Sequence, residues 1–341
     1  MTTRYVSLNP APGAPGPVAT AAMGFGGATV DGALEFATQF GLIAPTPGDG
    51  STRDLWEALA TLASHDLGVA RAVEPHLDAV AIVRQAGLDD LAHGATWGVF
   101  AAEGGNDPLT ASPVDGGWSL TGTKPWCSLA DRLDRALVTA RIGDGERGLF
   151  AVDLQADGVT PQAGAWHARG LSEIPSGPVV FRNVAATMVG EPGWYLSRPG
   201  FAWGGIGVAA CWFGGAVGLG RSLFAHLAES PDPIAAMHLG AVDEQLQSAR
   251  RALAEAATLV DEAPDDVDGS VLAKRVRSTV AAACESVLAH VAHALGPAPL
   301  ALDDEHAKRV ADLELYVRQH HAEKDLASLG SALARSGKAP W

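Results

Sequence analysis

The sequence predicts an α+β protein in which a β-rich region separates two helical regions. Between Gly94 and Val189, short runs of β-branched and aromatic residues alternate with glycine, aspartate and asparagine, as in strands joined by turns. Alanine- and leucine-rich segments with helical periodicity lie on both sides. This order predicts an N-terminal helical domain, a mostly antiparallel β-domain and a C-terminal four-helix bundle, at residues 1–93, 94–192 and 193–341.

The N-terminal region is expected to begin irregularly, because residues 1–50 are rich in proline and glycine. Its predicted helices are Asp31–Phe40, Thr52–Ala63 and Leu67–Gln85. Pro75 lies inside the last pattern and is expected to kink or split that helix. The same helix has a charged face, for which solvated ion pairing is expected: Arg71, Glu74 and Asp78.

The β-domain shows one clear hairpin. Arg135–Ile142 and Arg147–Asp153 are alternating runs that flank the sequence GDGE, which is typical of a tight turn between antiparallel strands. No G-x-G-x-x-G follows a strand and opens a helix, and no phosphate-loop motif is present. A doubly wound dinucleotide-binding fold is therefore disfavoured.

The C-terminal region reads as long helices separated by proline- and glycine-containing turns. The predicted helices cover 204–229, 235–262, 269–295 and 303–334. The stretch from Pro199 to Gly220 has no charge and is long enough to cross a bilayer. Because it is rich in glycine and has few basic flanking residues, we interpret it as a buried central helix that permits close helix packing.

Composition limits the function classes. A net charge of −15 argues against nucleic acid or an anionic membrane as the default partner. The three cysteines lie far apart in apolar contexts without metal-binding spacing, so buried, reduced thiols are expected at Cys127, Cys211 and Cys284. With no signal peptide recognised, the expected location is the cytoplasm.

One helical pattern near the end contains adjacent histidines. In LYVRQHHAEKDL (315–326), His320 extends an apolar stripe formed with Leu313, Tyr316 and Val317 at spacings of three and four residues. A buried structural histidine explains this position, and so does an imidazole that faces an active site. Both interpretations stay open on the sequence alone.

Four stretches resemble the acyl-CoA dehydrogenase family of flavoproteins. WGVFAAEGGNDPLTA (97–111) resembles the family strand that ends in Thr-Glu-Pro-x-x-Gly-Ser-Asp. GGWSLTGTKPWCSLADRLDRALVTAR (116–141) resembles its Gly-Lys-Lys-x-Trp-Ile-(Ser/Thr)-Asn-Ala segment, and VVFRNVAATMVGEPG (179–193) the strand that leaves the β-domain. The segment 293–321 resembles a Leu-Gly-Gly turn followed by a helix with Asp-x-x-x-Tyr, here Asp312 and Tyr316.

The resemblance implies the fold of that family and FAD as the cofactor. Trp126 matches the tryptophan beside the flavin, and Ser128 is expected on the same strand face as a donor to the ring. The strand near the pyrimidine end of the flavin and the turn near the dinucleotide supply the other predicted cofactor residues, which are Val99, Ala101, Ala102, His293 and Gly296.

The sequence also departs from the family. No arginine occupies the region 229–240, where the family arginine contacts the cofactor diphosphate. The catalytic glutamate position falls near His320, so a neutral histidine is the expected base, with Glu323 as its partner or as an alternative base. No metal site is predicted.

Three functions remain open. The first is an FAD-dependent, acyl-CoA dehydrogenase-like oxidation of an acyl thioester or related small molecule, with electrons passed to a partner. The second is a monooxygenase on the same fold, related to the dibenzothiophene monooxygenase type and supplied with reduced flavin, as RQHHAEKD (318–325) suggests. The third is a partner subunit without catalysis. The resemblance further implies a homodimer or homotetramer.

Overall fold

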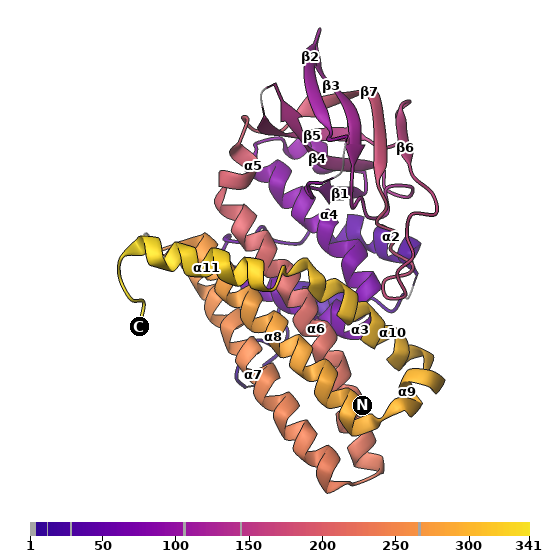
Figure 1. The fold of residues 1–341 in the computed structure, drawn as a ribbon, viewed down its shortest axis with the longest axis vertical. Coiled ribbons are helices and arrows are strands. Elements are labelled where there is room, and N and C mark those ends of the chain that lie inside the picture. Colours follow the sequence, from indigo (N-terminus) through magenta and orange to yellow (C-terminus); the bar gives the residue numbers. More distant parts are fainter. Residues whose placement is uncertain (1–4, 12, 28, 105–106, 144, 265–266) are drawn as a thin grey trace.

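The computed structural model describes residues 5–11, 13–27, 29–104, 107–143, 145–264 and 267–341. Helices, then strands, then helices follow one another along the chain, as the sequence predicted (Figure 1). Some residues of the quoted motifs lie outside the described ones: Gly105, Asn106 and Asp144.

The N-terminal helices are α1 (Pro17–Gly24), α2 (Val30–Phe40), α3 (Thr52–His65) and α4 (Leu67–Gln85), followed by the short helix η1 (Asp89–Ala92). The sequence did not predict α1. Asp66 separates α3 from α4 and caps α4, because its side chain accepts the Val69 N–H at 3.0 Å. Pro75 does not split α4, which is one helix packed against α2, α6 and β1.

The strands close into a barrel. They are β1 (Trp97–Phe100), β2 (Thr110–Val114), β3 (Gly117–Lys124), β4 (Arg135–Ile142), β5 (Glu146–Asp153), β6 (Val159–Pro161) and β7 (Val179–Met188). Closure follows because β5 pairs with β4 on one side and with β7 on the other. Strands β1 and β2 run parallel to β4, and the other pairs are antiparallel, so the mostly antiparallel domain is confirmed.

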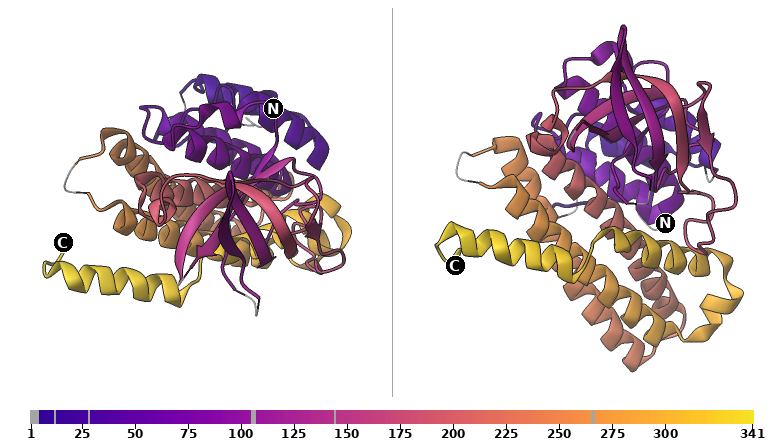
Figure 2. Two further views of the ribbon diagram at one scale, coloured as in Figure 1. Left: turned by 90° about the horizontal axis from the view of Figure 1, so that it is seen from above. Right: turned by 45° about the horizontal axis from the view of Figure 1, so that its top comes forward.

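The C-terminal elements are α5 (Trp194–Ser197), α6 (Pro199–Glu229), α7 (Pro233–Glu262), α8 (Gly269–Leu295), α9 (Pro297–Leu302), α10 (Asp304–Tyr316), η2 (Val317–Gln319) and α11 (Glu323–Ser336). Helix α6 packs against α3 on one side and against α7 and α8 on the other (Figures 1 and 2). Helix α11 contacts α8 and then extends away from the body of the molecule (Figure 2).

Helix α6 contains the uncharged segment Pro199–Gly220, which the sequence predicted to lie in the core. By length and composition it could cross a membrane, but 67% of its apolar window is buried inside the protein. A Cβ atom on Gly214 would lie 2.2 Å from the backbone oxygen of Ala60 in α3. Glycine is therefore required where these two helices cross.

The single helix predicted over 303–334 is wrong. Helix α10 ends at Tyr316, η2 follows, and Ala322 takes a left-handed φ of 47° before α11 begins. The backbone N–H of His321 donates to the Asp325 side chain at 3.0 Å, which stabilises the new helix start. The burial of Leu313, Tyr316, Val317 and His320 agrees with the predicted stripe, although His320 lies outside any helix.

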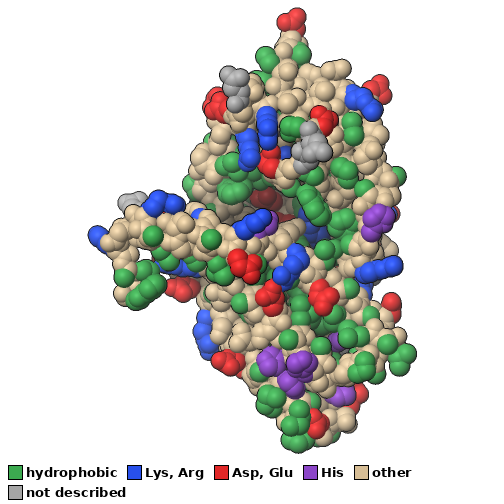
Figure 3. Space-filling model, in the orientation of Figure 1, with side chains coloured by type: hydrophobic (Ala, Val, Ile, Leu, Met, Phe, Trp, Pro, Cys, Tyr) green, Lys and Arg blue, Asp and Glu red, His purple; other side chains and the backbone are tan. Residues whose placement is uncertain are grey.

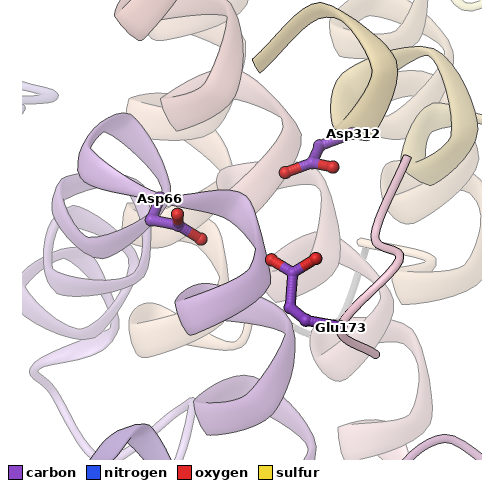
Figure 4. A group of neighbouring side chains, drawn as sticks. All are labelled: Asp66, Glu173 and Asp312. Atoms are coloured by element: carbon purple, nitrogen blue, oxygen red, sulfur yellow. The ribbon is translucent and has the colours of Figure 1, made fainter. Parts of the chain in front are cut away.

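One ammonium group joins the three parts of the fold. The carboxylates of Asp66, Glu173 and Asp312 converge from α4, the β-domain and α10 (Figure 4). The Lys308 Nζ atom lies 3.1 Å from Asp66, 2.7 Å from Glu173 and 2.6 Å from Asp312. Burial lowers the pKa of Lys308, but hydrogen bonds to Asp312 and Glu173 outweigh it and raise the pKa overall.

We expect Lys308→Met to destabilise the protein by about 2 kcal/mol, because three carboxylates lose their shared cation. This value lies between those of surface and buried pairs, since the Lys308 side chain is 36% exposed. Urea unfolding measures the free energy, and Lys324→Met on the exposed side of α11 is the matched control. Equal stability of the two variants would contradict the joining role of Lys308.

Candidate functional site

Two adjoining cavities lie between the β-domain and the helices. Their volumes are about 1000 Å³ and 790 Å³, and both are lined by Glu74, Asp78, Ala101 and Tyr195. We call the larger one the bundle cavity, because α6 and α8 line it, and the smaller one the strand cavity, because it contacts the end of β1. Figure 3 shows a hollow on this face, below the β-domain. These volumes suit small-molecule ligands.

The strand cavity brings together most of the residues predicted to bind the flavin. The end of β1 and the chain directly after it supply apolar and backbone groups. The turn after β3 supplies an indole and a hydroxyl. The predicted residues that line this cavity are Val99, Ala101, Ala102, Trp126 and Ser128.

The turn after β3 has an uncommon backbone conformation. Pro125 cannot donate a backbone hydrogen bond and follows the last residue of β3. Trp126 and Leu129 then take left-handed φ values of 59° and 57°, which bulky residues adopt only when their surroundings hold them. The Leu129 N–H donates to the Pro175 carbonyl at 2.8 Å and helps to hold the turn. Trp126 and Ser128 therefore do not share a strand face as predicted, although both line the cavity.

Trp126 forms an aromatic wall together with Trp166. Its side chain is 60% exposed, which is unusual for an indole, and it meets the Trp166 ring edge to face at 6.4 Å. An exposed aromatic pair beside a cavity offers apolar contact to a planar ligand.

Ser128 belongs to a buried polar network. Arg71 Nη2 donates to the Ser128 hydroxyl at 2.9 Å, and the hydroxyl oxygens of Ser128 and Ser176 lie 2.7 Å apart. The Ser176 hydroxyl also lies 3.1 Å from the Ile174 carbonyl, to which it can donate. If Ser176 donates to Ser128 instead, the Ser128 hydrogen is free for an acceptor in the cavity.

The charged face of α4 is not solvated, so that expectation is wrong. The β-domain and the bundle cover it, and Glu74 is 8% exposed, with its nearest cation, Arg71 Nη1, at 3.9 Å. Burial raises the pKa of Glu74 to about 7, against the opposing effect of Arg71. Burial also raises the pKa of Asp78. The guanidinium of Arg198, 3.7 Å away, opposes this rise. Glu74 can therefore act as an acid or a base near neutral pH.

His320 lines the bundle cavity and not the strand cavity. It is 9% exposed, and its Nε2 atom lies 3.1 Å from the Ser278 hydroxyl and 3.8 Å from Asp325. Burial lowers the pKa of His320, and the nearby Arg277 lowers it further, while Asp325 opposes both. The imidazole is therefore neutral at pH 7, as a base requires.

Glu323 is not the partner that the sequence suggested. It is exposed at the start of α11 and lines neither cavity. Asp325 lies beside His320 instead and also approaches His321 Nδ1 at 3.5 Å. The break before α11 turns the chain, so helical spacing counted through it chose the wrong carboxylate.

His293 and Gly296 lie at the end of α8, and neither lines the two cavities. Gly296 has a φ of 68° and ends the helix. Their predicted contact with a dinucleotide has no counterpart in the cavities of this chain.

Sequence reasoning missed several groups around the cavities. Buried charges on α4 were visible as breaks in its apolar stripe, but they were interpreted as a solvated face. The guanidinium of Arg277 lies 4.7 Å from the Trp212 ring and donates to the Gly205 carbonyl at 2.6 Å. No local pattern predicted this contact, because α8 and α6 meet only in three dimensions. The same holds for Trp166 and Ser176.

Comparisons with known proteins define the fold. No protein-family model matches the chain, and no curated protein matches it. Solved structures do. TdsC from Paenibacillus sp. A11-2, in complex with FMN and indole, is 19% identical with a TM-score of 0.79, over 95% of this chain and 97% of that one.

Two further solved structures have a similar fold. KijD3 in complex with FMN and dTDP-3-amino-2,3,6-trideoxy-4-keto-3-methyl-D-glucose is 18% identical with a TM-score of 0.78, over 94% and 91% of the chains. Butyryl-CoA dehydrogenase from Megasphaera elsdenii is 19% identical with a TM-score of 0.77, over 89% and 90%. The predicted acyl-CoA dehydrogenase-like fold is thus confirmed, and identities this low show the fold alone.

The raised pKa of Glu74 predicts a stability change with pH. Its ordinary pKa is 4.5 and its folded value is about 7, so the folded state binds the extra proton between these values. Stability from this group is therefore lost as the pH rises from about 4.5 through 7, by about 3 kcal/mol. We expect the free energy of unfolding of Glu74→Gln, relative to that of the unmodified protein, to rise by about that much from pH 5 to pH 8. Urea unfolding at each pH measures it.

The exposed Glu323→Gln is the matched control, since it removes the same charge from the surface. A stability difference between Glu74→Gln and the unmodified protein that stays constant with pH would contradict the raised pKa.

Proposed function

We propose that this chain is a flavin-dependent oxidoreductase whose flavin ring occupies the strand cavity. The groups there suit an isoalloxazine: an indole wall from Trp126 and Trp166, backbone at the end of β1, and the Ser128 hydroxyl. The position of Ser128 carries the proposal. Its buried hydroxyl lines the cavity and has a hydrogen that can turn towards an acceptor.

We favour FMN over the FAD that the resemblance implied. The TdsC and KijD3 structures that share this fold are complexes with FMN. In this chain the region 229–240 has no arginine for a diphosphate, and His293 and Gly296 line neither cavity. These observations support a mononucleotide, whose binding needs no groups for a second phosphate.

Within this class we propose a monooxygenase that receives reduced flavin from a separate electron-transfer partner. The bound flavin supplies electrons for the reaction of oxygen with the substrate. Arg71 donates to Ser128 and brings positive charge to the cavity, which favours anionic species there. Glu74 lines both cavities and holds or releases a proton near pH 7 at the boundary between flavin and substrate.

A second candidate is the dehydrogenation of an acyl thioester, and a specific observation supports it. Glu323, the carboxylate that the sequence offered near the expected base position, lines neither cavity, but Glu74 brings a carboxylate into both cavities from α4. A desolvated carboxylate with a raised pKa suits the removal of a weakly acidic proton next to a carbonyl. In this dehydrogenation, Glu74 and not His320 is the base that we favour.

The substrate is a small molecule bound in the bundle cavity. Phe201, Trp203 and Leu259 give that cavity an apolar wall, while Arg277 and Asp325 add charge. A mixed lining of this kind suits an organic ligand with a polar end. The homodimer or homotetramer implied by the resemblance remains a prediction.

Flavin binding tests the class. We expect added FMN to bind in place of FAD, measured by the quenching of flavin fluorescence. Ser128→Ala should weaken binding about fivefold, since a hydrogen bond contributes about 1 kcal/mol. Ser119→Ala, on β3 and outside both cavities, is the matched control. A protein that takes up neither flavin would overturn the proposal and leave the non-catalytic alternative.

Two assays separate the candidate reactions. Oxygen consumption that depends on supplied reduced FMN and on a substrate supports the monooxygenase. Bleaching of the bound flavin by an acyl-CoA under anaerobic conditions supports the dehydrogenase and contradicts the monooxygenase.

Acid–base chemistry is expected to depend on Glu74. Glu74→Gln should lower turnover by about 100-fold or more with flavin still bound, because a positioned acid or base contributes about that factor. The unmodified enzyme should show a rate change with pH centred near 7, which this variant lacks. Loss of turnover in His320→Ala, but not in Glu74→Gln, would assign the role to His320 instead.

A further inference from the structure

The bundle cavity is lined by two cations that no acidic side chain pairs with. Arg198, Lys274 and Arg277 all line this cavity. Arg198 has a counter-ion, because its Nη2 atom lies 3.7 Å from Asp78. In the part of the chain that the structure describes, no ion pair joins Lys274 or Arg277 to a carboxylate. These two side chains on α8 therefore bring unpaired positive charge to the cavity wall.

The Arg277 guanidinium contacts neutral groups and keeps donors for a ligand. Its Nη1 atom donates to the Gly205 carbonyl at 2.6 Å, and its Nη2 atom donates to the Gln319 carbonyl at 3.1 Å. These bonds use two of the five guanidinium N–H donors. Burial lowers the pKa of Arg277, and the nearby Asp325 offsets this effect only in part. The surroundings thus disfavour the charge of Arg277, which an anionic ligand would balance.

Two carboxylates that line the same cavity already stabilise the starts of helices. The Asp268 Oδ1 atom accepts the backbone N–H groups of Ser270 and Val271 at 2.8 and 3.1 Å, at the start of α8. The Asp325 Oδ2 atom accepts the backbone N–H of His321 at 3.0 Å, beside the start of α11. Because these hydrogen bonds hold both carboxylates at helix starts, neither forms an ion pair with the cations of α8.

The spacing of the two cations suits one anionic group. Lys274 and Arg277 are three residues apart on α8, so their side chains leave the same face of the helix. The Lys274 Nζ atom donates to the Ser270 hydroxyl at 3.1 Å, which uses one of its three hydrogens. A guanidinium binds a carboxylate through two parallel N–H donors, and an ammonium adds a point charge.

Large apolar side chains from α5 and α6 are exposed at the same cavity. Leu196 is 45% exposed and Phe201 is 42% exposed, and Trp203 also lines the cavity. The Phe201 ring meets the Tyr195 ring edge to face at 5.3 Å, which supports the apolar wall. A ligand with an apolar body would remove these side chains from water, while its anionic end would pair with the cations of α8.

We propose that the bundle cavity takes an organic carboxylic acid with an apolar body, bound as its carboxylate by Arg277. Lys274 adds a second positive charge, and the apolar body lies against Phe201 and Trp203. The proposal names the substrate class of the flavin-dependent reaction proposed above and rests on that function. Glu74 lines both cavities, so the acid binds next to the group expected to transfer protons.

Calorimetric titration of the full chain, with and without FMN, tests the charge preference. The probes are naphthoate, phenylbutyrate and octanoate, each compared with its own amide, which has the same shape and no charge. We expect at least one acid to bind about tenfold more tightly than its amide, because charge-assisted hydrogen bonds are about twice as strong as neutral ones. Added NaCl should weaken binding of the acid but not of the amide.

Substitutions on α8 assign the preference to its residues. Arg277→Gln should bring the affinities of acid and amide to within about twofold of each other, whereas a purely structural role would weaken both equally. Lys274→Met should weaken binding of the acid about threefold, as expected for a partly exposed ion pair. Arg275→Met is the matched control, because Arg275 is exposed on the same helix and lines neither cavity.

Each other result counts against the carboxylate site. Equal affinities for acid and amide, or no saturable binding of any acid, would overturn it, and so would an unchanged preference in Arg277→Gln. If Arg277→Gln fails to fold, Lys274→Met decides, and a loss no larger than in Arg275→Met contradicts the proposal. FMN binding is measured separately: a charge preference without FMN binding would overturn the flavin function alone, and FMN binding without the preference would overturn the substrate class alone.

Discussion

The cleft that comprises the strand cavity and the bundle cavity keeps its shape through the Lys308 ammonium and the three carboxylates around it, Asp66, Glu173 and Asp312. Asp312 does more than pair with Lys308, because its Oδ1 atom accepts the backbone N–H of Leu171 at 2.6 Å. Leu171 has a left-handed φ of 48°, and its carbonyl accepts the Trp166 indole N–H at 3.1 Å. The ion cluster thereby fixes the loop that carries one aromatic wall of the strand cavity. The Asp312 carboxylate of α10 thus helps to hold the Trp166 indole of the β-domain in place.

The cleft also concentrates charges that a purely structural core would avoid. Desolvating Glu74 and Asp78 is costly, and the nearest guanidinium nitrogens, from Arg71 and Arg198, lie at 3.9 and 3.7 Å, beyond hydrogen-bonding distance. An apolar stripe would pack α4 against the bundle with less expense in stability. Buried ionisable groups with raised pKa values beside a cavity are typical of functional sites. Glu74 and Asp78 therefore lower the stability of the fold and give the cleft groups that can exchange protons.

Local patterns predicted much of the fold. Helices α4 and α8 and strand β4 have the predicted limits, because periodicity and turn residues mark their ends. The segment VRQHHA, in contrast, contains neither proline nor glycine, yet the chain breaks there, and Ala322 adopts a positive φ. Contacts remote in sequence decide such a break: Arg277 of α8 donates to the Gln319 carbonyl at 3.1 Å. A single sequence has no local signal for that bond.

The same limit explains how the site was predicted. Trp126 and Ser128 were found through a contiguous motif, so their assignment did not require the correct backbone. To predict the role of Glu74, one would need to know what covers α4. Charged residues at i, i+3 and i+4 have the same spacing on a solvated face and on a buried one.

His320 and Glu74 differ in where they can act. His320 lines only the bundle cavity and already has two polar neighbours, Ser278 and Asp325. Glu74 lines both cavities, and within the described residues its ion pair with Arg71 is long, at 3.9 Å, so its carboxyl group can exchange a proton with a ligand. Their pKa values are moved in opposite directions by the same burial, down for the imidazole and up for the carboxyl. Near pH 7, Glu74 therefore changes protonation state at the boundary between the two cavities, and His320 is a neutral part of the wall of the bundle cavity.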